Sequence, residues 1–93
     1  MELAIAIKCV PAVPGAYVLQ GVKGLHYTGA ARNLRERLKD HLAGRARRTR
    51  NQRPLALIFW EPAADYTTAL AREKFLKSGA GRLWLKTEQT VSP

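Results

Sequence analysis

GAYVLQGVKGLHYTG, residues 15–29, contains two short aromatic and aliphatic segments separated by a loop with a glycine at each end. Residues 16–20 and 25–28 are rich in the side chains that strands favour, and the GVKG between them suits a hairpin loop. The pattern therefore predicts two adjacent antiparallel strands, one carrying Tyr17 and the other Tyr27. Single tyrosines in strands are more often core residues than catalysts, so their meaning depends on what surrounds them.

The segment that follows this hairpin gives the clearest helix signal of the chain. Within residues 30–44, Leu34, Leu38 and Leu42 recur at four-residue intervals. This spacing puts the three leucines on one side of a helix. Gly44 comes at the end of the pattern and is a residue that commonly terminates helices.

A third strand and a second helix are predicted further along. The apolar run LALIFWEP, residues 55–62, is bounded by prolines and is typical of a buried strand. Asp65 can cap a second helix that runs to about Lys77. The SGAG at residues 78–81 should break that helix, and residues 82–86 should add one or two further helical turns.

The predicted elements indicate one small domain. Residues 2–8 alternate loosely between apolar and polar side chains and predict one more strand. Together the elements predict an α/β (α+β) fold, in which a central antiparallel sheet of about three strands is flanked by helices. At 93 residues and 46% apolar, the chain is long enough for one such core, so we expect residues 1–93 to form a single domain.

The composition of the chain limits the classes of partner and the cellular compartment that we expect. It has 16 Lys and Arg against 7 Asp and Glu, a formal net charge of +9, and such an excess attracts polyanions, nucleic acid first. Cys9 is the single cysteine, which excludes an intrachain disulfide, a zinc ribbon and a CxxC motif and favours a cytoplasmic protein. The first apolar run is too short and interrupted for a signal peptide or a membrane span, so no membrane partner is expected.

Polar side chains on otherwise apolar helix faces are candidates for a functional site. His41 projects close to the leucine stripe of the first long helix, and Arg37 lies at its edge. Glu73 falls near the middle of the apolar side of the second helix. A carboxylate there must be protonated, ion-paired or bound to a cation, and an ion pair with an arginine in the core is the simplest alternative to a functional role.

Two tripeptides of the opening stretch resemble a known signature. GAY at residues 15–17 and YTG at residues 27–29 look like the two halves of the GIY-YIG nuclease motif, with Ala16 and Thr28 in place of its usual isoleucines. The family's helical arginine falls on Arg37 and its Tyr-or-His position on His41, both in the expected order.

The resemblance continues into the second helix. ALAREKFLKSGAGR, residues 69–82, looks like the corresponding segment of small stand-alone bacterial members, whose metal-binding glutamate matches Glu73. In all, the similarity covers residues 14–86, nearly the whole chain.

This resemblance implies a metal-dependent endonuclease that hydrolyses phosphodiester bonds, with DNA favoured over RNA and recognition by shape rather than by sequence. Glu73 would hold a single Mg²⁺ or Mn²⁺, and Arg37 would donate to the phosphate oxygens. Tyr17 and Tyr27 would position or deprotonate the attacking water, and one of them is a candidate general base. His41 is an alternative base or proton relay because histidine titrates nearer to neutral pH than a phenol.

Arginines supply the candidate contacts to nucleic acid. Many family members have a lysine or another polar residue where this chain has Ala30, and Arg32 or Arg35 could supply the missing phosphate contact. A basic run follows the first long helix, and its loop can touch several phosphates while reading little sequence. Its arginines are Arg45, Arg47, Arg48, Arg50 and Arg53. The alternative is a solvated basic loop with no defined register.

Two other functions remain open at this point. The first is a nucleic-acid-binding module that keeps the fold without efficient cleavage, which Ala30 favours. The second is a subunit whose protein partner supplies specificity, and its sequence clue is Phe75, which projects from the second helix away from Glu73.

Overall fold

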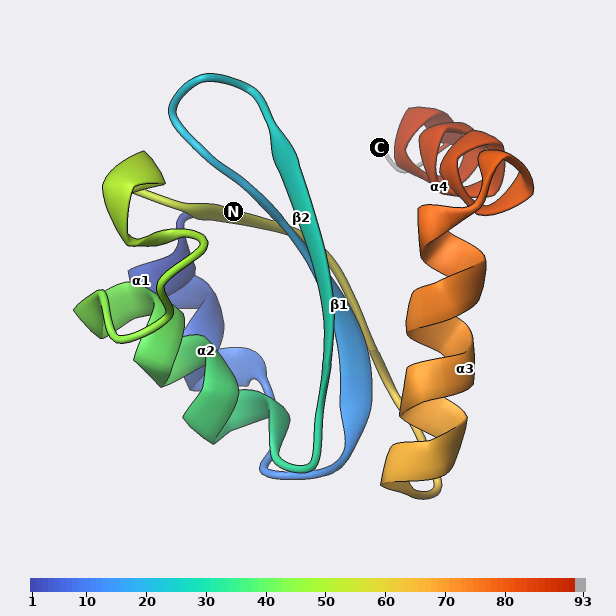
Figure 1. The fold of residues 1–93 in the computed structure, drawn as a ribbon, viewed down its shortest axis with the longest axis horizontal. Coiled ribbons are helices and arrows are strands. Elements are labelled where there is room, and N and C mark those ends of the chain that lie inside the picture. The colour runs from blue at the N-terminus through green and yellow to red at the C-terminus, as the bar shows by residue number, and fades with distance from the viewer. Residues whose placement is uncertain (92–93) are drawn as a thin grey trace.

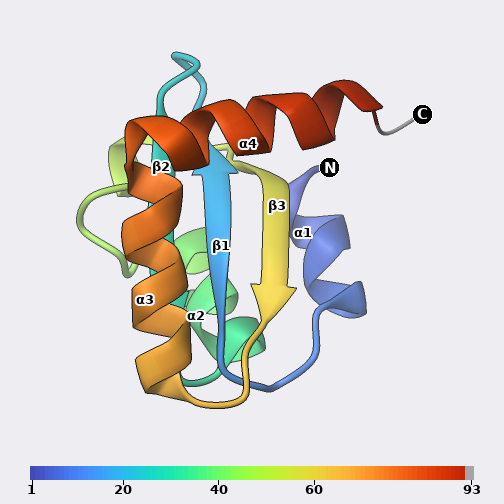
Figure 2. The same ribbon diagram turned by 90° about the vertical axis from the view of Figure 1, so that its right-hand side faces the viewer.

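In a computed structural model, which describes the backbone of residues 1–91 and the side chains of residues 1–87, the chain forms three layers (Figure 1, Figure 2). In chain order the elements are α1 (Leu3–Ala6), η1 (Ile7–Cys9), β1 (Gly15–Gln20), β2 (His26–Ala31), α2 (Leu34–Ala43), η2 (Arg50–Gln52), β3 (Ala56–Pro62), α3 (Tyr66–Lys77) and α4 (Gly79–Val91). The middle layer is an antiparallel sheet with the order β2-β1-β3. Helices α1 and α2 cover one face, and α3 and α4 cover the other. The predicted fold class is confirmed.

The hairpin of β1 and β2 brings the two tyrosines to one face of the sheet. Tyr17 pairs with Gly29 across the strands, and Tyr27 pairs with Leu19. The two tyrosines are therefore diagonal neighbours on the side that faces α2. The strand β1 is buried from its first residue to Leu19, because it lies in the centre of the sheet with helices on both sides.

Helix α2 buries a histidine where the sequence pattern expected a leucine. Leu34 and Leu38 are fully buried, whereas Leu42 is 41% exposed and His41 takes the core position of the third turn. The helix begins later than predicted because residues 30–31 still belong to β2. Asn33 accepts a hydrogen bond from the Glu36 amide and so caps the new start.

The prediction of a strand at residues 2–8 is wrong. Only Glu2 makes a bridge to β3, and the chain then turns into α1 and η1. The side chains buried in this segment are Leu3, Ala6, Ile7 and Val10, which follow a helical and not an alternating spacing. The strand β3 is consequently an edge strand of the three-stranded sheet, and its apolar run reflects the helices on both of its faces.

Helices α3 and α4 meet at a tight corner. Asp65 caps α3 through the Thr68 amide, as predicted, and the helix ends at Lys77. The hydroxyl of the next residue, Ser78, accepts a hydrogen bond from the Gly81 amide. A Cβ at Gly81 would overlap the backbone of Phe75, so the corner requires a glycine. Helix α4 then runs for 13 residues, longer than the predicted turn or two. In the described range, no helix combines the length and apolarity needed to cross a membrane.

Candidate active site

A chain of hydrogen bonds links the centre of the sheet to helix α2 and to the loop that follows it. The Tyr17 hydroxyl lies 2.8 Å from His41 Nε2, and His41 Nδ1 lies 2.7 Å from Thr49 Oγ1. Tyr17 and His41 are fully buried, and Thr49 is nearly so. Each polar atom of the imidazole therefore has one partner inside the protein.

The imidazole in this chain is neutral at pH 7. Burial and the positive charge of Arg37 lower the pKa of His41 to about 4, although Asp40 opposes them. A neutral imidazole carries one N–H and has one accepting nitrogen, which matches the two hydroxyl partners of the ring.

The phenol at the other end of the chain resists ionisation. Burial and the neighbouring Tyr27 raise the pKa of Tyr17, and so does the charge of Glu73, while Arg37 acts in the opposite direction. The hydroxyl consequently keeps its hydrogen, and a neutral imidazole can carry its proton on either nitrogen. Both tautomers satisfy the ring: one accepts from Tyr17 and donates to Thr49, and the other does the reverse.

Tyr27 and Arg37 complete the cluster on this face. The ring centroid of Tyr27 lies 6.3 Å from that of Tyr17 and 5.2 Å from that of His41. Burial alone would lower the pKa of Arg37, but interactions with both phenols more than offset it, and the pKa is raised. The guanidinium also lies 3.8 Å from the carboxylate of Asp40, and because the Arg37 side chain is 39% exposed, an anion can reach it from solvent.

Glu73 approaches the cluster from the other face of the sheet. It lies on α3, which packs along the edge strand β2 on the side opposite α2 (Figure 1). Its Oε2 is 3.1 Å from Nζ of Lys77, one helical turn further on, and its side chain is 20% exposed. The ion pair expected for this carboxylate therefore exists, but with a lysine of the same helix and not with an arginine.

The donors present fit a cation that is held by one carboxylate. Among the residues that the structure describes, no three His, Cys, Asp or Glu side chains gather into a ready-made metal site. Mg²⁺ often uses only one or two carboxylates and completes its shell with waters and substrate phosphates. Glu73 offers one such carboxylate, partly open to solvent and within electrostatic reach of Tyr17.

Gly29 makes room for the buried phenol. A Cβ at this position would lie 2.5 Å from both Cζ and Oη of Tyr17, far closer than van der Waals contact. The backbone of Gly29 is extended, so its glycine is required by space and not by φ. The last residue of the YTG tripeptide thus sets how closely Tyr17 packs against β2.

Replacing Gly29 with Ala is expected to push the phenol away from His41. Such overpacking should destabilise the fold by about 1–3 kcal/mol, and the displaced hydroxyl should lower cleavage by about 10²-fold. Gly79→Ala is the matched control because a Cβ there meets nothing within 4 Å. Urea unfolding and a cleavage rate for both variants test this. Equal behaviour of the two would show that Tyr17 is not held by its packing against β2.

Thr49 is a site residue that sequence reasoning missed. It lies inside the basic run, where only its small size among arginines marks it. Local turns bury it: the Thr49 amide donates to the Ala46 carbonyl, and Ala46 is itself buried. The loop that carries the arginines is therefore anchored to the tyrosine and histidine by this side chain.

Thr49→Val keeps the shape of the side chain and removes its hydroxyl. The buried Nδ1 of His41 then loses its partner, which should destabilise the fold by about 1–3 kcal/mol. If the threonine also orients the imidazole, kcat should fall while KM stays nearly constant, and Thr49→Ser should restore both properties. Unfolding curves and steady-state kinetics measure the two effects. A Thr49→Val protein that matches the parent in both would remove the threonine from the site.

Arg32 and Arg35, the two candidate substitutes for a polar residue at position 30, are already engaged. Arg35 Nε donates to the Val10 carbonyl at 2.8 Å and thereby holds the N-terminal segment against α2. The Arg32 guanidinium lies 4.2 Å from the centroid of the Tyr66 ring. Of the two, Arg32 is the more exposed.

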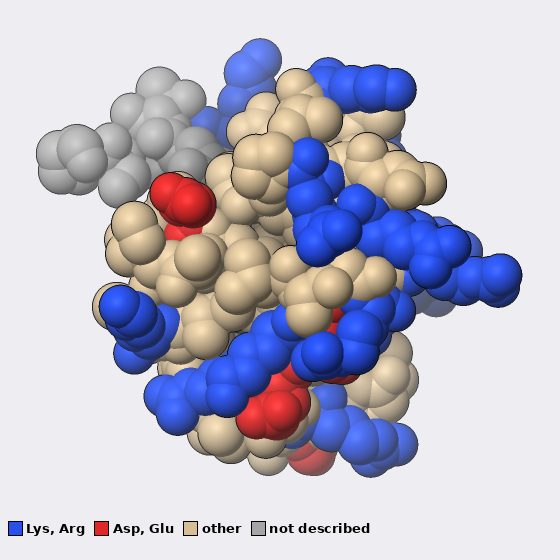
Figure 3. Space-filling model, turned by 90° about the vertical axis from the view of Figure 1, so that its left-hand side faces the viewer, with Lys and Arg blue, Asp and Glu red and all other residues tan. Residues whose placement is uncertain are grey.

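The arginines of the basic run fall into two groups, those bound to other parts of the protein and those with exposed side chains. Arg45 is 2.9 Å from Asp40, and Arg53 donates to the carbonyls of Arg50 and Leu42, so both guanidinium groups support the loop. The side chains of Arg47, Arg48 and Arg50 are exposed. Figure 3 shows bands of Lys and Arg across the side of the molecule that carries α1 and α2, with few acidic side chains between them.

Phe75, the sequence clue to a protein partner, does not lie on an open surface. It is partly buried and packs against Trp84, whose ring also contacts Phe59. The Arg72 guanidinium lies 4.8 Å from the Phe75 ring centroid and covers it. This side chain is part of the core beneath α4, so it gives no support to a protein partner.

Comparisons with known proteins identify the family of the chain. Residues 14–86 match the family model described as the GIY-YIG catalytic domain. The chain belongs to the GIY-YIG family. The resemblance drawn from the two tripeptides, Arg37, His41 and Glu73 is thereby confirmed at the level of the family, which is a family of nucleases.

Two curated relatives of the GIY-YIG chain are similar over about two thirds of its length. It is 36% identical over 63 residues to UPF0213 protein DP2720 of Desulfotalea psychrophila, and the match covers 66% of this chain and 57% of that protein. It is 39% identical over 62 residues to UPF0213 protein YE0453 of Yersinia enterocolitica, covering 66% and 64%. The matches therefore span less than two thirds of either relative. No solved structure gives a significant match.

Proposed function

We propose that the protein is a metal-dependent endonuclease that hydrolyses phosphodiester bonds in DNA and selects its substrates by shape. The observation that carries the proposal is the cluster in which Tyr17 is hydrogen-bonded to a buried His41, Tyr27 packs against the same imidazole, and Arg37 interacts electrostatically with both phenols. Such a cluster offers a guanidinium to a phosphate and a path for a proton leaving the attacking water.

The proton path begins at Tyr17. The phenolic oxygen takes a proton from the water as the phenol passes its own hydrogen to Nε2 of His41. This transfer uses the tautomer with its proton on Nδ1, and the contact of Nδ1 with Thr49 then fixes the ring. This coupled transfer explains how a phenol whose pKa is raised can serve as the base, since no free phenolate has to form.

Arg37 would bind the phosphate and would also affect the proton transfer from Tyr17 to His41. Its guanidinium, held by both phenols, donates to the non-bridging oxygens as negative charge develops in the transition state. The positive charge of Arg37 is also a cause of the lowered pKa of His41. A phosphate that pairs with Arg37 offsets this charge, so substrate binding makes the imidazole a better proton acceptor.

Glu73 would hold the cation, Mg²⁺ or Mn²⁺. A cation bound there would act as a Lewis acid on the phosphate and stabilise the leaving oxygen. The carboxylate would exchange its pairing with Lys77 for the cation, and the released ammonium group would stay close enough to contact the substrate backbone.

The charge distribution supports binding to the nucleic-acid backbone and not the reading of base sequence. Contacts to several phosphates are supported by the net charge of +9 and by the exposed side chains of Arg47, Arg48 and Arg50. Such contacts with the backbone carry no direct sequence information. Binding should therefore weaken steeply with salt and vary little with sequence.

A cleavage time course tests the proposal. Labelled single-stranded, duplex, flap and four-way DNA, together with an RNA hairpin, would be incubated with the protein in Mg²⁺, Mn²⁺ or EDTA. We expect cutting of at least one DNA shape in either metal and none in EDTA. Cutting that persists in EDTA would exclude the metal, and cutting of the RNA hairpin alone would exclude DNA as the substrate.

Binding without cleavage is a second candidate, and one contact favours it. The carboxylate of Glu73 is already paired with Lys77, which competes with a cation for the same oxygens. A protein of this kind would bind the substrate panel in a salt-dependent manner and leave every member intact in both metals. If cutting then appeared only on addition of native extract, a partner subunit would be required.

A further inference from the structure

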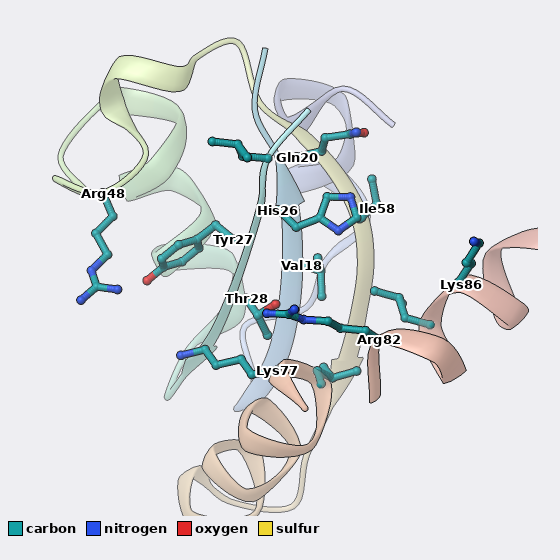
Figure 4. Close-up of a pocket in the computed structure, with 13 residues that line it drawn as sticks. Val18, Gln20, His26, Tyr27, Thr28, Arg48, Ile58, Lys77, Arg82 and Lys86 are labelled. Atoms are coloured by element: carbon teal, nitrogen blue, oxygen red, sulfur yellow. The ribbon is translucent and has the colours of Figure 1, made fainter. Parts of the chain in front are cut away.

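A hollow of about 940 Å³ lies on the face of the sheet that α3 and α4 cover (Figure 4). It lies mainly on the face of the sheet opposite Tyr17, and it reaches the basic run at Arg48 and the tyrosine cluster at Tyr27. Its floor is aliphatic and includes Val18, Ile58, Leu76 and Leu85. This volume is near the upper end of the range of about 300–1,000 Å³ that small-ligand pockets occupy.

The rim of this hollow, which we call the α4 groove, is positively charged. Arg48 borders it from the loop after α2, Lys77 from the end of α3, and Arg82 and Lys86 from α4. In Figure 4 the side chains of Lys77 and Arg82 extend across the groove toward β2. No Asp or Glu occurs among the described residues that line it.

The groove opens at one end onto the cluster formed by Tyr17, Tyr27, Arg37 and His41. Tyr27 lines its β2 end and also lies 5.2 Å, centroid to centroid, from His41. Lys77 lines the groove and is the ion-pair partner of Glu73. A nucleic-acid strand with its scissile phosphate at Arg37 would therefore continue past Tyr27 and Lys77 into the groove.

We propose that the α4 groove binds an unpaired stretch of nucleic acid next to the scissile phosphate. The proposal rests on the endonuclease function proposed above and adds a requirement for a single-stranded flank. The cations of the rim would contact phosphates, as in other channels for single strands, and the exposed bases would lie on the aliphatic floor. The imidazole of His26, which extends over the groove in Figure 4, gives a flat surface on which a base can stack.

A duplex does not fit this groove. The whole molecule has principal extents of 30 × 29 × 25 Å, and a hollow of about 940 Å³ within it has room for a few nucleotides of one strand only. In a duplex, moreover, the bases are stacked and paired and cannot contact an aliphatic floor. An acidic protein segment also matches the charge of the rim, and the test separates this occupant from a single strand.

Binding in EDTA tests the groove without requiring cleavage. The probes are a blunt DNA hairpin and the same hairpin with an unpaired tail at either end. The groove variant is Arg82→Gln with Lys86→Gln. Its control is Lys8→Gln with Lys39→Gln, which removes the same charge from exposed side chains of η1 and α2.

We expect the groove variant to lose at least tenfold in affinity for a tailed hairpin and less than threefold for the blunt one. Its salt dependence for the tailed hairpin should also flatten, by about 0.7 in the log–log slope for each lost phosphate contact. The control should weaken both probes by the same small factor. A third variant, His26→Ala, should weaken only the tailed probe.

Equal losses for the tailed and blunt hairpins, or no loss for either, would overturn the proposal, and unchanged binding would leave an acidic protein segment as the occupant to examine. Thermal melting of each variant ensures that a loss of affinity is not a loss of fold. These binding measurements contain no metal, so they test the groove even if the protein never cleaves DNA. If the protein does cleave DNA but the groove variant binds both hairpins normally, the endonuclease proposal stands and the groove proposal fails.

Discussion

Glu73→Gln is expected to lower kcat for metal-dependent cleavage by about 10³-fold or more. A cation at this position would supply several kcal/mol of transition-state stabilisation, and each 1.4 kcal/mol corresponds to a tenfold rate. Glutamine keeps the size of the side chain but is a weaker ligand for a hard cation than a carboxylate. The loss should therefore fall on catalysis, and raising the concentration of Mg²⁺ should recover part of it.

The fold should survive this substitution. The ion pair between Glu73 and Lys77 joins two residues one helical turn apart, and such pairs stabilise a helix by only about 0.2–0.5 kcal/mol. Glu36→Gln is the matched control, because Glu36 also forms an ion pair within one helix. Its Oε1 lies 3.5 Å from Nζ of Lys39, three residues further along α2. DNA binding in EDTA should be kept or slightly strengthened in both variants, since each removes a negative charge.

Cleavage rates across a series of Mg²⁺ and Mn²⁺ concentrations, with melting curves for each protein, give the measurement. A Glu73→Gln protein that cuts as fast as the Glu36→Gln control would contradict the assignment of the cation to this carboxylate. If the natural chain cuts nothing, the same pair of variants still shows whether Glu73 opposes DNA binding.

The strong local signals of the sequence predicted the elements that build the sheet and the two long helices. Gly24 has a φ of +82° in the hairpin loop, and Asp65 caps α3, so these residue types carried structural information that needs no tertiary context. The segment of α1 could not be predicted in this way. A helix of four residues has little stability of its own, and it forms because Leu3 and Ala6 are buried against the rest of the core.

The candidate site was predictable only in part for a similar reason. The spacing of Glu73 and Lys77 is visible in the sequence, and the ion pair they form could have been expected from it. The contact of His41 with Thr49 joins residues eight apart through a loop whose turns depend on backbone hydrogen bonds. No periodic pattern marks such a loop, so the residue that fixes the imidazole was hidden among arginines.

Tyr17→Phe should reduce kcat by about 10²–10⁴-fold, the range that proton transfer by a positioned side chain contributes. Phenylalanine keeps the ring and its packing against Gly29 but removes the hydroxyl that reaches His41. The proton of the attacking water then has no acceptor next to the imidazole. KM should change little, because Arg37 keeps its charge and its contact with Tyr27.

Tyr17→Phe should also destabilise the fold, and a matched control distinguishes this effect from the effect on catalysis. Without the hydroxyl, Nε2 of His41 is buried without a partner, which should lower the free energy of unfolding by about 1–3 kcal/mol. Tyr66→Phe is the control, since Tyr66 lies beneath Arg32 on α3, outside the hydrogen-bonded chain. It should leave both stability and cleavage nearly unchanged.

The pH dependence distinguishes a relay from a structural hydrogen bond. In the natural chain the pKa of His41 is about 4, so kcat/KM, which reports the free protein, should fall only as the pH approaches that value. The acid limb of kcat should lie higher, because the bound phosphate offsets the charge of Arg37. In Tyr17→Phe the histidine no longer receives the proton of the phenol, and this acid limb should disappear from the residual rate. An identical acid limb in both proteins would mean that His41 fixes Tyr17 in place and takes no part in moving the proton.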